Sequence, residues 1–228
     1  MGFGVVGQSF AKLLLSRSAD LYSKYGIKPR IVACVDNNGS AISPAGLDAK
    51  RLLESKKTKG TVGDYEKGNT KFDPLQVIEK VDAEVMLECT PTNLNDAEPA
   101  TSHITVAMRS RKHVICVNKG PLALAFPSLI ELANYNGVML RFSGTVGGGT
   151  PILEFAKRCL KGDRIISFHG ILNGTTNYIL SKMEEGRTYE MAMNDAKEKG
   201  YTEPTRRLTS MALTRLQNWL SWLTGLWE

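Results

Sequence analysis

Apolar positions along the chain fall into two kinds of run. Short continuous apolar runs, typical of buried strands, occur within residues 29–39, 83–93, 113–124 and 138–144. Segments with helical spacing or a polar helix-forming composition separate them, at residues 2–17, 46–57, 100–112 and 126–137. This alternation predicts an α/β fold with a parallel, doubly wound sheet up to about residue 130.

The pattern changes after this region. A glycine loop leads into a helix within 145–160, and residues 163–185 read as a strand, a polar turn and a helix. A last clear helix is expected at 188–200, with Gly200 at its end. We therefore predict three parts: a first domain at 1–130, an incomplete second α/β domain at 131–204 and an aberrant tail at 205–228.

Composition narrows the class of protein. The chain is 42% hydrophobic and 23% charged, and its net charge of +6 is spread along the sequence, which indicates a solvated surface and no nucleic-acid face. Its four cysteines form no CxxC pair, and three lie in apolar runs, which favours reduced thiols in a cytoplasmic protein. No transmembrane run and no signal peptide are expected.

The first motif is a glycine-rich turn that leads into a helix. Its residues are Gly2, Phe3, Gly4, Val5, Val6 and Gly7, a G-x-G-x-x-G pattern. Such glycines allow a tight turn and a close approach of a pyrophosphate to the helix N-terminus. Asp36 ends the next apolar run, where an acid can bind an adenosine ribose. Together these features predict a dinucleotide site; the alternative is a purely structural turn.

The fingerprint is expected to follow a strand, but only Met1 precedes it. In the usual strand order that first strand lies in the middle of the sheet. We therefore expect a Rossmann-type domain that lacks its first strand, so that either the start is misassigned or the chain is a fragment.

Two further segments lie where apolar runs end. These are Thr90 with Pro91, and Asn118 with Lys119. Ligands of open α/β sheets bind at this edge. Lys119 can present its ammonium group there to a substrate hydroxyl or to a cofactor, although a surface lysine in a turn is the alternative.

Other polar features are less specific. Three glycines at 147–149 fit an ion-binding loop or a plain turn, and the Asn-Gly-Thr-Thr-Asn cluster at 173–177 fits a site or a helix cap. His103, His113 and His169 have no metal-ligand spacing, and we interpret them as structural.

Taken in order, these stretches resemble homoserine dehydrogenase over residues 1–204. The resemblance is carried by GFGVVGQSFAKLL, LECTPTN, KHVICVNKGPLAL, SGTVGGGTPIL, GDRIISFHGILNGTTNYIL and AKEKGYTEP, of which NKGPLA and GILNGTTNYI are the most specific. The resemblance implies NAD- or NADP-dependent interconversion of L-homoserine and L-aspartate 4-semialdehyde, in the biosynthesis of threonine, methionine and isoleucine. It also implies a homodimer formed through the second domain.

The resemblance also implies roles for individual residues. Lys119 would be catalytic, near the reacting oxygen, and would contact the nicotinamide side together with Thr90 and Pro91. The implied substrate-binding residues are Glu203, Tyr201, Asn173, Gly174, Thr175 and Thr176. A loop that binds a monovalent cation in some members matches Ser143, Val146, Gly148 and Thr150, with Ser143 where a glutamate is often found. Asp36 favours NAD, because a carboxylate repels a 2′-phosphate and no lysine or arginine is adjacent in sequence.

The tail departs from the family pattern. The positions of a catalytic Asp and a Lys are held by Thr214 and Asn218, and the tail has no acidic residue before Glu228. Reading the tail back with one base restored after the Pro204 codon permits the family's Asp-Pro, Asp-x-x-Gly-x-Asp and Lys. We interpret the tail as frame-shifted, with a natural divergent helix as the alternative, and expect little or no turnover from the chain as written.

Two other functions compete with this interpretation. The first alternative to a dehydrogenase by descent is a non-catalytic nucleotide-binding or interaction protein on the same fold. Another Rossmann oxidoreductase, such as a semialdehyde or shikimate dehydrogenase, is disfavoured by NKGPLA together with GILNGTTNYI.

Overall fold

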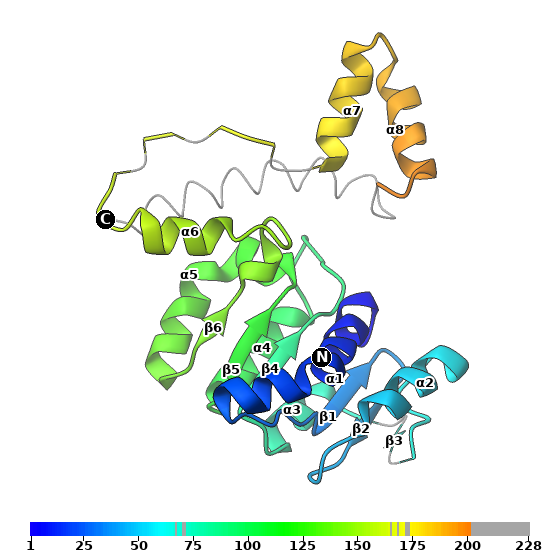
Figure 1. The fold of residues 1–228 in the computed structure, drawn as a ribbon, viewed down its shortest axis with the longest axis vertical. Helices are drawn as coiled ribbons and strands as arrows, with labels where there is room; N and C mark the ends of the chain where they lie inside the picture. Colours follow the sequence, from blue (N-terminus) through cyan, green and yellow to red (C-terminus); the bar gives the residue numbers. More distant parts are fainter. Residues whose placement is uncertain (67, 70–71, 165, 168, 172–173, 202–228) are drawn as a thin grey trace. The chain divides into compact units, whose positions relative to one another are not determined.

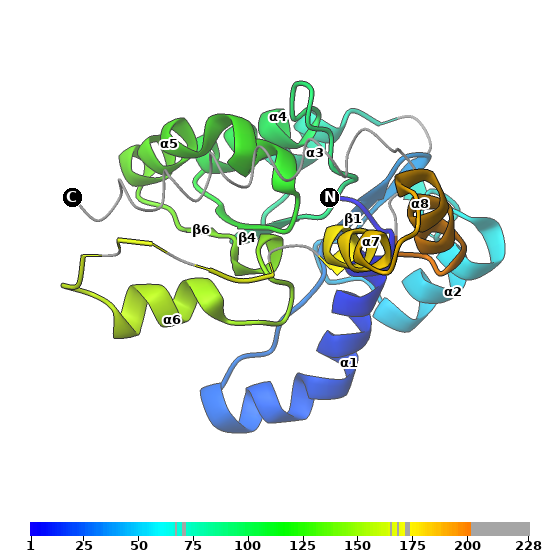
Figure 2. The ribbon, with the colours of Figure 1, turned by 90° about the horizontal axis from the view of Figure 1, so that it is seen from above.

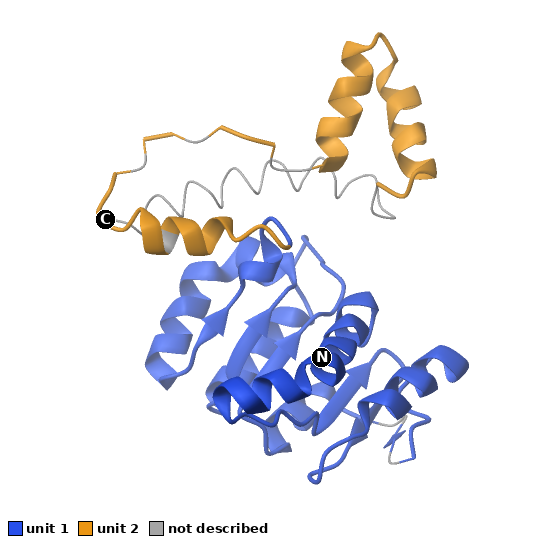
Figure 3. Cartoon of the chain, in the orientation of Figure 1, with its two compact units in different colours: residues 1–148 blue, residues 149–228 orange. Residues whose placement is uncertain are grey.

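The computed structural model describes residues 1–66, 68–69, 72–164, 166–167, 169–171 and 174–201. The chain divides into two compact units, residues 1–148 and 149–228 (Figure 3). The first unit runs through α1 (Val5–Tyr25), β1 (Ala33–Asp36), β2 (Gly39–Ile42), α2 (Ala49–Lys59), β3 (Gly68–Asn69), α3 (Pro74–Lys80), β4 (Val85–Glu88), α4 (Ala100–Arg109), β5 (His113–Cys116), α5 (Lys119–Asn136), β6 (Leu140–Arg141) and the 3-10 turn η1 (Ser143–Thr145) (Figure 1).

The strands of the first unit form two three-stranded sheets. β4, β5 and β6 pair in parallel in that order, and β1, β2 and β3 pair antiparallel. Helices α3, α4 and α5 lie on one face of the strands, and α1 and α2 lie on the other (Figure 2). The predicted α/β fold with helices on both faces is confirmed.

The first residues of the chain join the two sheets. The Met1 amino nitrogen donates to Leu87 O at 2.6 Å and the Cys89 N–H donates to Met1 O at 2.9 Å, which is the pattern of a parallel pair. On the other side, the Gly2 N–H donates to Val35 O at 2.9 Å. Met1 and Gly2 therefore lie between β1 and β4, where the first strand of a Rossmann sheet belongs.

Two elements differ from the sequence-based expectation. The turn after Asp36 reverses the chain into an antiparallel hairpin with β2, which the apolar pattern did not predict. Helix α5 begins at Lys119, ahead of the expected start at residue 126, because the Asn118 side chain caps it by accepting the Gly120 N–H at 2.9 Å. Its backbone leaves helical geometry at Ala125, two residues before Pro127.

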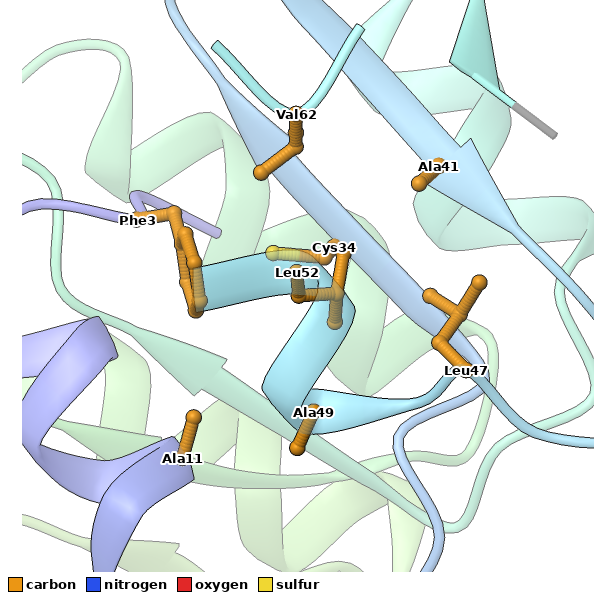
Figure 4. Packing of buried hydrophobic residues seen from close by; sticks show 8 residues of the cluster. All are labelled: Phe3, Ala11, Cys34, Ala41, Leu47, Ala49, Leu52 and Val62. Carbon is orange, nitrogen blue, oxygen red and sulfur yellow. The ribbon is translucent and has the colours of Figure 1, made fainter. Parts of the chain in front are cut away.

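One core lies between α1, β1 and α2 (Figure 4). It consists of Phe3, Ala11, Cys34, Ala41, Leu47, Ala49, Leu52 and Val62. Phe3 is only 4% exposed, so its side chain packs into this core and anchors the glycine turn to the sheet.

In the second unit the structure describes three helices: α6 (Ile152–Cys159), α7 (Gly174–Glu184) and α8 (Tyr189–Glu198). Ile179 packs against Ala192, Met193 and Ala196 between α7 and α8. The strand expected after residue 163 is not formed in the described residues of 163–171. A strand needs a partner for its backbone groups, and the described part of this unit contains none. None of the described helices is long and apolar enough to cross a membrane.

Asp36 ties the end of β1 to the segment that follows α2. Its Oδ1 accepts from the Asn38 N–H and the Thr61 hydroxyl, both at 2.9 Å. Its Oδ2 accepts from the Val62 N–H at 2.9 Å and from Lys56 Nζ at 2.6 Å. Burial by itself raises the pKa of Asp36, but these hydrogen bonds, led by that from Lys56, outweigh it and hold the pKa below its ordinary value of 3.8.

We expect Asp36→Asn to lower the free energy of unfolding by about 2 kcal/mol at pH 7, because an amide cannot accept from all four donors. A carboxylate with a depressed folded-state pKa contributes stability that is full above pH 3.8 and is lost as the pH falls through the folded-state pKa. The gap between the two proteins, measured by urea unfolding, should therefore narrow below about pH 4. A difference in unfolding free energy that stays constant from pH 7 to pH 3 would contradict a stabilising role for the charged Asp36 carboxylate.

The matched control is Asp20→Asn. Asp20 pairs with Arg17 at 2.8 Å on the surface of α1, with both side chains about half or more exposed. Its substitution should change the free energy of unfolding by less than about 0.5 kcal/mol.

Candidate functional site

The three glycines of the first motif have three different surroundings. A Cβ on Gly2, whose φ is +81°, would lie 2.6 Å from the backbone carbonyl of Cys89, and one on Gly7 would lie 2.5 Å from Gly2 O. A Cβ on Gly4 would meet no atom within 4 Å. Gly2 is therefore needed for close packing of the turn against the end of β4, and Gly7 for close packing of α1 on the turn, whereas Gly4 leaves open space.

That open space lies at the N-terminus of α1. Gly4 is the N-cap residue, no side chain caps the helix, and its first turn has no acidic residue. The first N–H groups of the helix and its dipole therefore favour an anion there. A tight turn, an open glycine and a close-packed glycine in this order are what a pyrophosphate-binding turn requires, so the residues present fit a dinucleotide.

The Thr-Pro loop and Lys119 lie beside this turn at the carboxyl edge of the parallel strands. Asn118 Nδ2 donates to Thr90 O at 3.0 Å, to Thr90 Oγ1 at 3.1 Å and to Pro91 O at 3.1 Å. The Lys119 N–H donates to Thr92 Oγ1 at 3.4 Å, and the Lys119 side chain is exposed. Because Gly2 packs on the backbone of Cys89 and Thr90, the glycine turn, Thr90, Pro91 and Lys119 come together in one place.

Several predicted residues of the dinucleotide site have other surroundings than expected. The Phe3 side chain is in the core, so only its backbone faces the turn, while Val5 and Val6 are exposed at the start of α1. Asp36 is buried and both its oxygens are already hydrogen-bonded. No lysine is adjacent to Asp36 in sequence, but Lys56 approaches it from α2, a contact that the sequence separation concealed.

The loop predicted to bind a cation extends from η1 to the start of α6. Ser143 begins η1, Val146 follows it and donates its N–H to Ser143 O at 3.4 Å, and Gly148 has a φ of +57°. Thr150 belongs to the second unit, where its carbonyl accepts the Ile152 N–H at 2.9 Å. The cation site stays a prediction.

Two of the segments predicted to bind substrate meet within the second unit. Gly174 begins α7 with Thr175 and Thr176 in its first turn, and the Thr175 hydroxyl donates to Tyr201 O. The Tyr178 ring also packs edge-on against that of Tyr201, with centroids 5.1 Å apart. Asn173 and Glu203 lie outside the described residues, as do Thr214 and Asn218 of the tail.

All four cysteines are free, and the chemistry of the buried ones is that of neutral thiols. Burial raises the pKa of Cys34 to about 12 and that of Cys116 to about 12. Burial also raises the pKa of Cys89, whose Sγ donates to Met1 O at 3.2 Å and Gly2 O at 3.1 Å. These thiols therefore stay protonated at neutral pH and do not supply a thiolate nucleophile.

Sequence reasoning noted Asn118 and His103 but not their contacts behind the site, and it missed Glu88. Asn118 holds the Thr-Pro loop, and Glu88 and His103 form a buried pair under Thr90, with His103 Nδ1 at 2.9 Å from Glu88 Oε2. The signal for Glu88 was present: it is the one acid inside the apolar run VMLE that forms β4. His103 was interpreted as structural, and its carboxylate partner is fifteen residues earlier in sequence.

Models of two protein families match the chain in different parts. The model described as Glutamate/Leucine/Phenylalanine/Valine dehydrogenase matches residues 1–117, the half with the glycine turn. The model described as Homoserine dehydrogenase matches residues 151–208.

Individual proteins resemble the chain across both parts. The homoserine dehydrogenase of Methanocaldococcus jannaschii is 42% identical over 92% of this chain and 63% of its own length. The NAD(+)-dependent homoserine dehydrogenase of Pseudomonas canavaninivorans is 37% identical over 89% of this chain and 58% of its own. The chain thus spans about three fifths of the length of these two relatives.

Solved structures give the same result for the fold. A hyperthermophilic archaeal homoserine dehydrogenase in complex with NADPH superposes with a TM-score of 0.84 at 25% identity, over 98% of this chain and 67% of that one. The homoserine dehydrogenase of Thiobacillus denitrificans has a TM-score of 0.69 at 25% identity, over 91% and 43% of the two chains. In its fold, its glycine turn and these relatives, the chain is similar to homoserine dehydrogenases over about nine tenths of its length.

Proposed function

We propose that this chain carries the dinucleotide-binding domain and part of the substrate domain of an enzyme that interconverts L-homoserine and L-aspartate 4-semialdehyde. Such a reaction serves the biosynthesis of threonine, methionine and isoleucine. The observation that carries the proposal is the glycine turn, in which Gly2 and Gly7 are packed tightly and Gly4 is open, beside Thr90 and Lys119. Relatives named as NAD(+)-dependent, or solved with NADPH, support the use of NAD or NADP.

Each part of the site has a task in this proposal. The N-terminus of α1, at Gly4 and Val5, would hold the pyrophosphate, and Thr90 and Pro91 would face the nicotinamide end. The nicotinamide supplies or accepts a hydride when it is bound. Lys119 would hold a proton near the substrate oxygen, since it is exposed and follows the end of β5.

The substrate side is proposed on the resemblance together with contacts in the second unit. Tyr201, whose carbonyl accepts from the Thr175 hydroxyl, would line the substrate side. On the resemblance, the carboxylate of Glu203 would bind the substrate ammonium group. We also propose a homodimer and a cytoplasmic location, the latter supported by four unpaired cysteines.

The tail limits what the chain does as written. A catalytic Asp and Lys are expected where Thr214 and Asn218 stand. Without them the chain would bind dinucleotide but turn over little substrate.

The dinucleotide site is tested by calorimetric titration with NADH and NADPH. Gly4→Ala should weaken binding of the preferred dinucleotide at least about tenfold, because the added methyl group fills the space that a phosphate needs. Its cost to folding should be small, about 1 kcal/mol for a poorer N-cap. Gly170→Ala, in the second unit, is the control for the glycine-to-alanine change itself, because a Cβ there also meets nothing within 4 Å. Equal affinity in Gly4→Ala and the unsubstituted chain would overturn the assignment.

Gly7→Ala separates packing from binding. Its Cβ would lie 2.5 Å from Gly2 O, so the free energy of unfolding should fall by about 1–3 kcal/mol even without a ligand. Urea unfolding of both variants tests this. The free energy of unfolding should fall more in Gly7→Ala than in Gly4→Ala.

Turnover of the chain as written is tested by following NAD(P)H absorbance with L-homoserine as substrate. We expect kcat at least about a hundredfold below that of the full-length relative from M. jannaschii, because general acid–base groups contribute about that much or more. Adding one base to the gene after the Pro204 codon restores the reading frame. The protein expressed from that gene should regain activity. Comparable kcat values for the chain as written and the relative would show that the tail supplies its own catalytic groups.

A further inference from the structure

The end of β4 contains a completely buried carboxylate that the proposed reaction does not use. Glu88 is the last residue of the strand, and its side chain is 0% exposed. Burying a charge is costly unless each oxygen has a partner, so the contacts of Glu88 indicate what it is for.

Both oxygens of Glu88 are paired. Oε1 accepts from the Thr90 N–H at 2.8 Å and also from the Thr90 hydroxyl. Oε2 faces His103 Nδ1 at 2.9 Å, and the His103 side chain, on α4, is only 5% exposed. The carboxylate thus lies between a helix on one side and the loop of the dinucleotide site on the other.

This pairing fixes whether the Thr90 hydroxyl donates or accepts a hydrogen bond toward other groups. A hydroxyl has one proton, and here Glu88 accepts it, so Thr90 Oγ1 can only accept from other groups. It already accepts from Asn118 Nδ2 at 3.1 Å, which leaves one lone pair of Oγ1. A ligand group at Thr90 Oγ1 must therefore be a hydrogen-bond donor.

The same contacts continue to the start of α5. Asn118 holds the carbonyls of Thr90 and Pro91 with its amide NH2 and accepts the Gly120 N–H at 2.9 Å with Oδ1. The backbone that places Lys119 is therefore connected to Glu88 through Thr90 and Asn118.

We propose that Glu88, oriented by His103, is a positioning residue for the nicotinamide end of the dinucleotide site. It acts through Thr90, whose Oγ1 it holds as an acceptor for the NH2 of a carboxamide. The inference rests on the proposed function, since it requires that a dinucleotide binds at this edge. Glu88 itself touches no ligand.

The test compares a dinucleotide with the same molecule lacking its nicotinamide. NADH with ADP-ribose, or NADPH with 2′-phospho-ADP-ribose, is titrated calorimetrically, using whichever pair the unsubstituted chain binds more tightly. Glu88→Gln keeps the shape but replaces a charged acceptor with a neutral one, so NAD(P)H binding should weaken about fivefold. Binding of the ADP-ribose analogue should not change.

A second variant tests whether Glu88 acts through Thr90. Thr90→Val removes the hydroxyl and should weaken NAD(P)H binding by a similar factor, again without affecting the ADP-ribose analogue. Added to Thr90→Val, the Glu88→Gln change should then have no further effect on affinity, because coupled residues are not additive. Glu66→Gln is the matched carboxylate-to-amide control, since Glu66 pairs with Arg51 on the exposed surface.

Each outcome bears on the inference. Equal losses for NAD(P)H and the ADP-ribose analogue in Glu88→Gln would make Glu88 a purely structural residue and overturn the inference, as would additive losses in the double variant or no loss at all. If Glu88→Gln does not fold, the selective loss in Thr90→Val decides. If the unsubstituted chain binds neither ligand, the proposed function fails as well, and that result differs from any failure of Glu88 alone.

Discussion

The first unit depends on a few backbone hydrogen bonds made by its first two residues. Met1 pairs with Leu87 and Cys89 at the end of β4, while Gly2 pairs with Val35 in β1. These bonds connect an antiparallel sheet to a parallel one that otherwise makes no ladder with it. They also fix where the glycine turn leaves the sheet, and so where α1 points its N-terminus.

The chemistry of the candidate site follows from that placement. A helix N-terminus without an acidic or capping side chain, at the carboxyl edge of parallel strands, is a place where an anion replaces water at low cost. Thr90 and Lys119 reach the same edge because β4 and β5 run in parallel and end side by side. The site is thus assembled from strand ends, and the buried Glu88, His103 and Asn118 hold those ends in a fixed relation.

Buried charge has two different roles in this unit. Asp36 and Glu88 both end strands, and both have every oxygen paired. Asp36 pairs with Lys56 of α2 and so stabilises the end of the β1 strand. Glu88 instead orients the Thr90 hydroxyl, beside the candidate site. In the sequence the two acids look alike, since each follows an apolar run, and only their partners in the structure distinguish them.

The sequence by itself determined the class of fold and the position of the glycine turn, because local apolar periodicity and the need for glycine are written in neighbouring residues. It also predicted that Thr90 and Lys119 share an edge, since parallel strands end together. Tertiary structure alone decided the antiparallel hairpin after Asp36, the approach of Lys56 to that acid and the Glu88–His103–Thr90 contacts. Each of these depends on side chains far apart in sequence, and their pairing is set by how helices pack on the sheet, which no local pattern records.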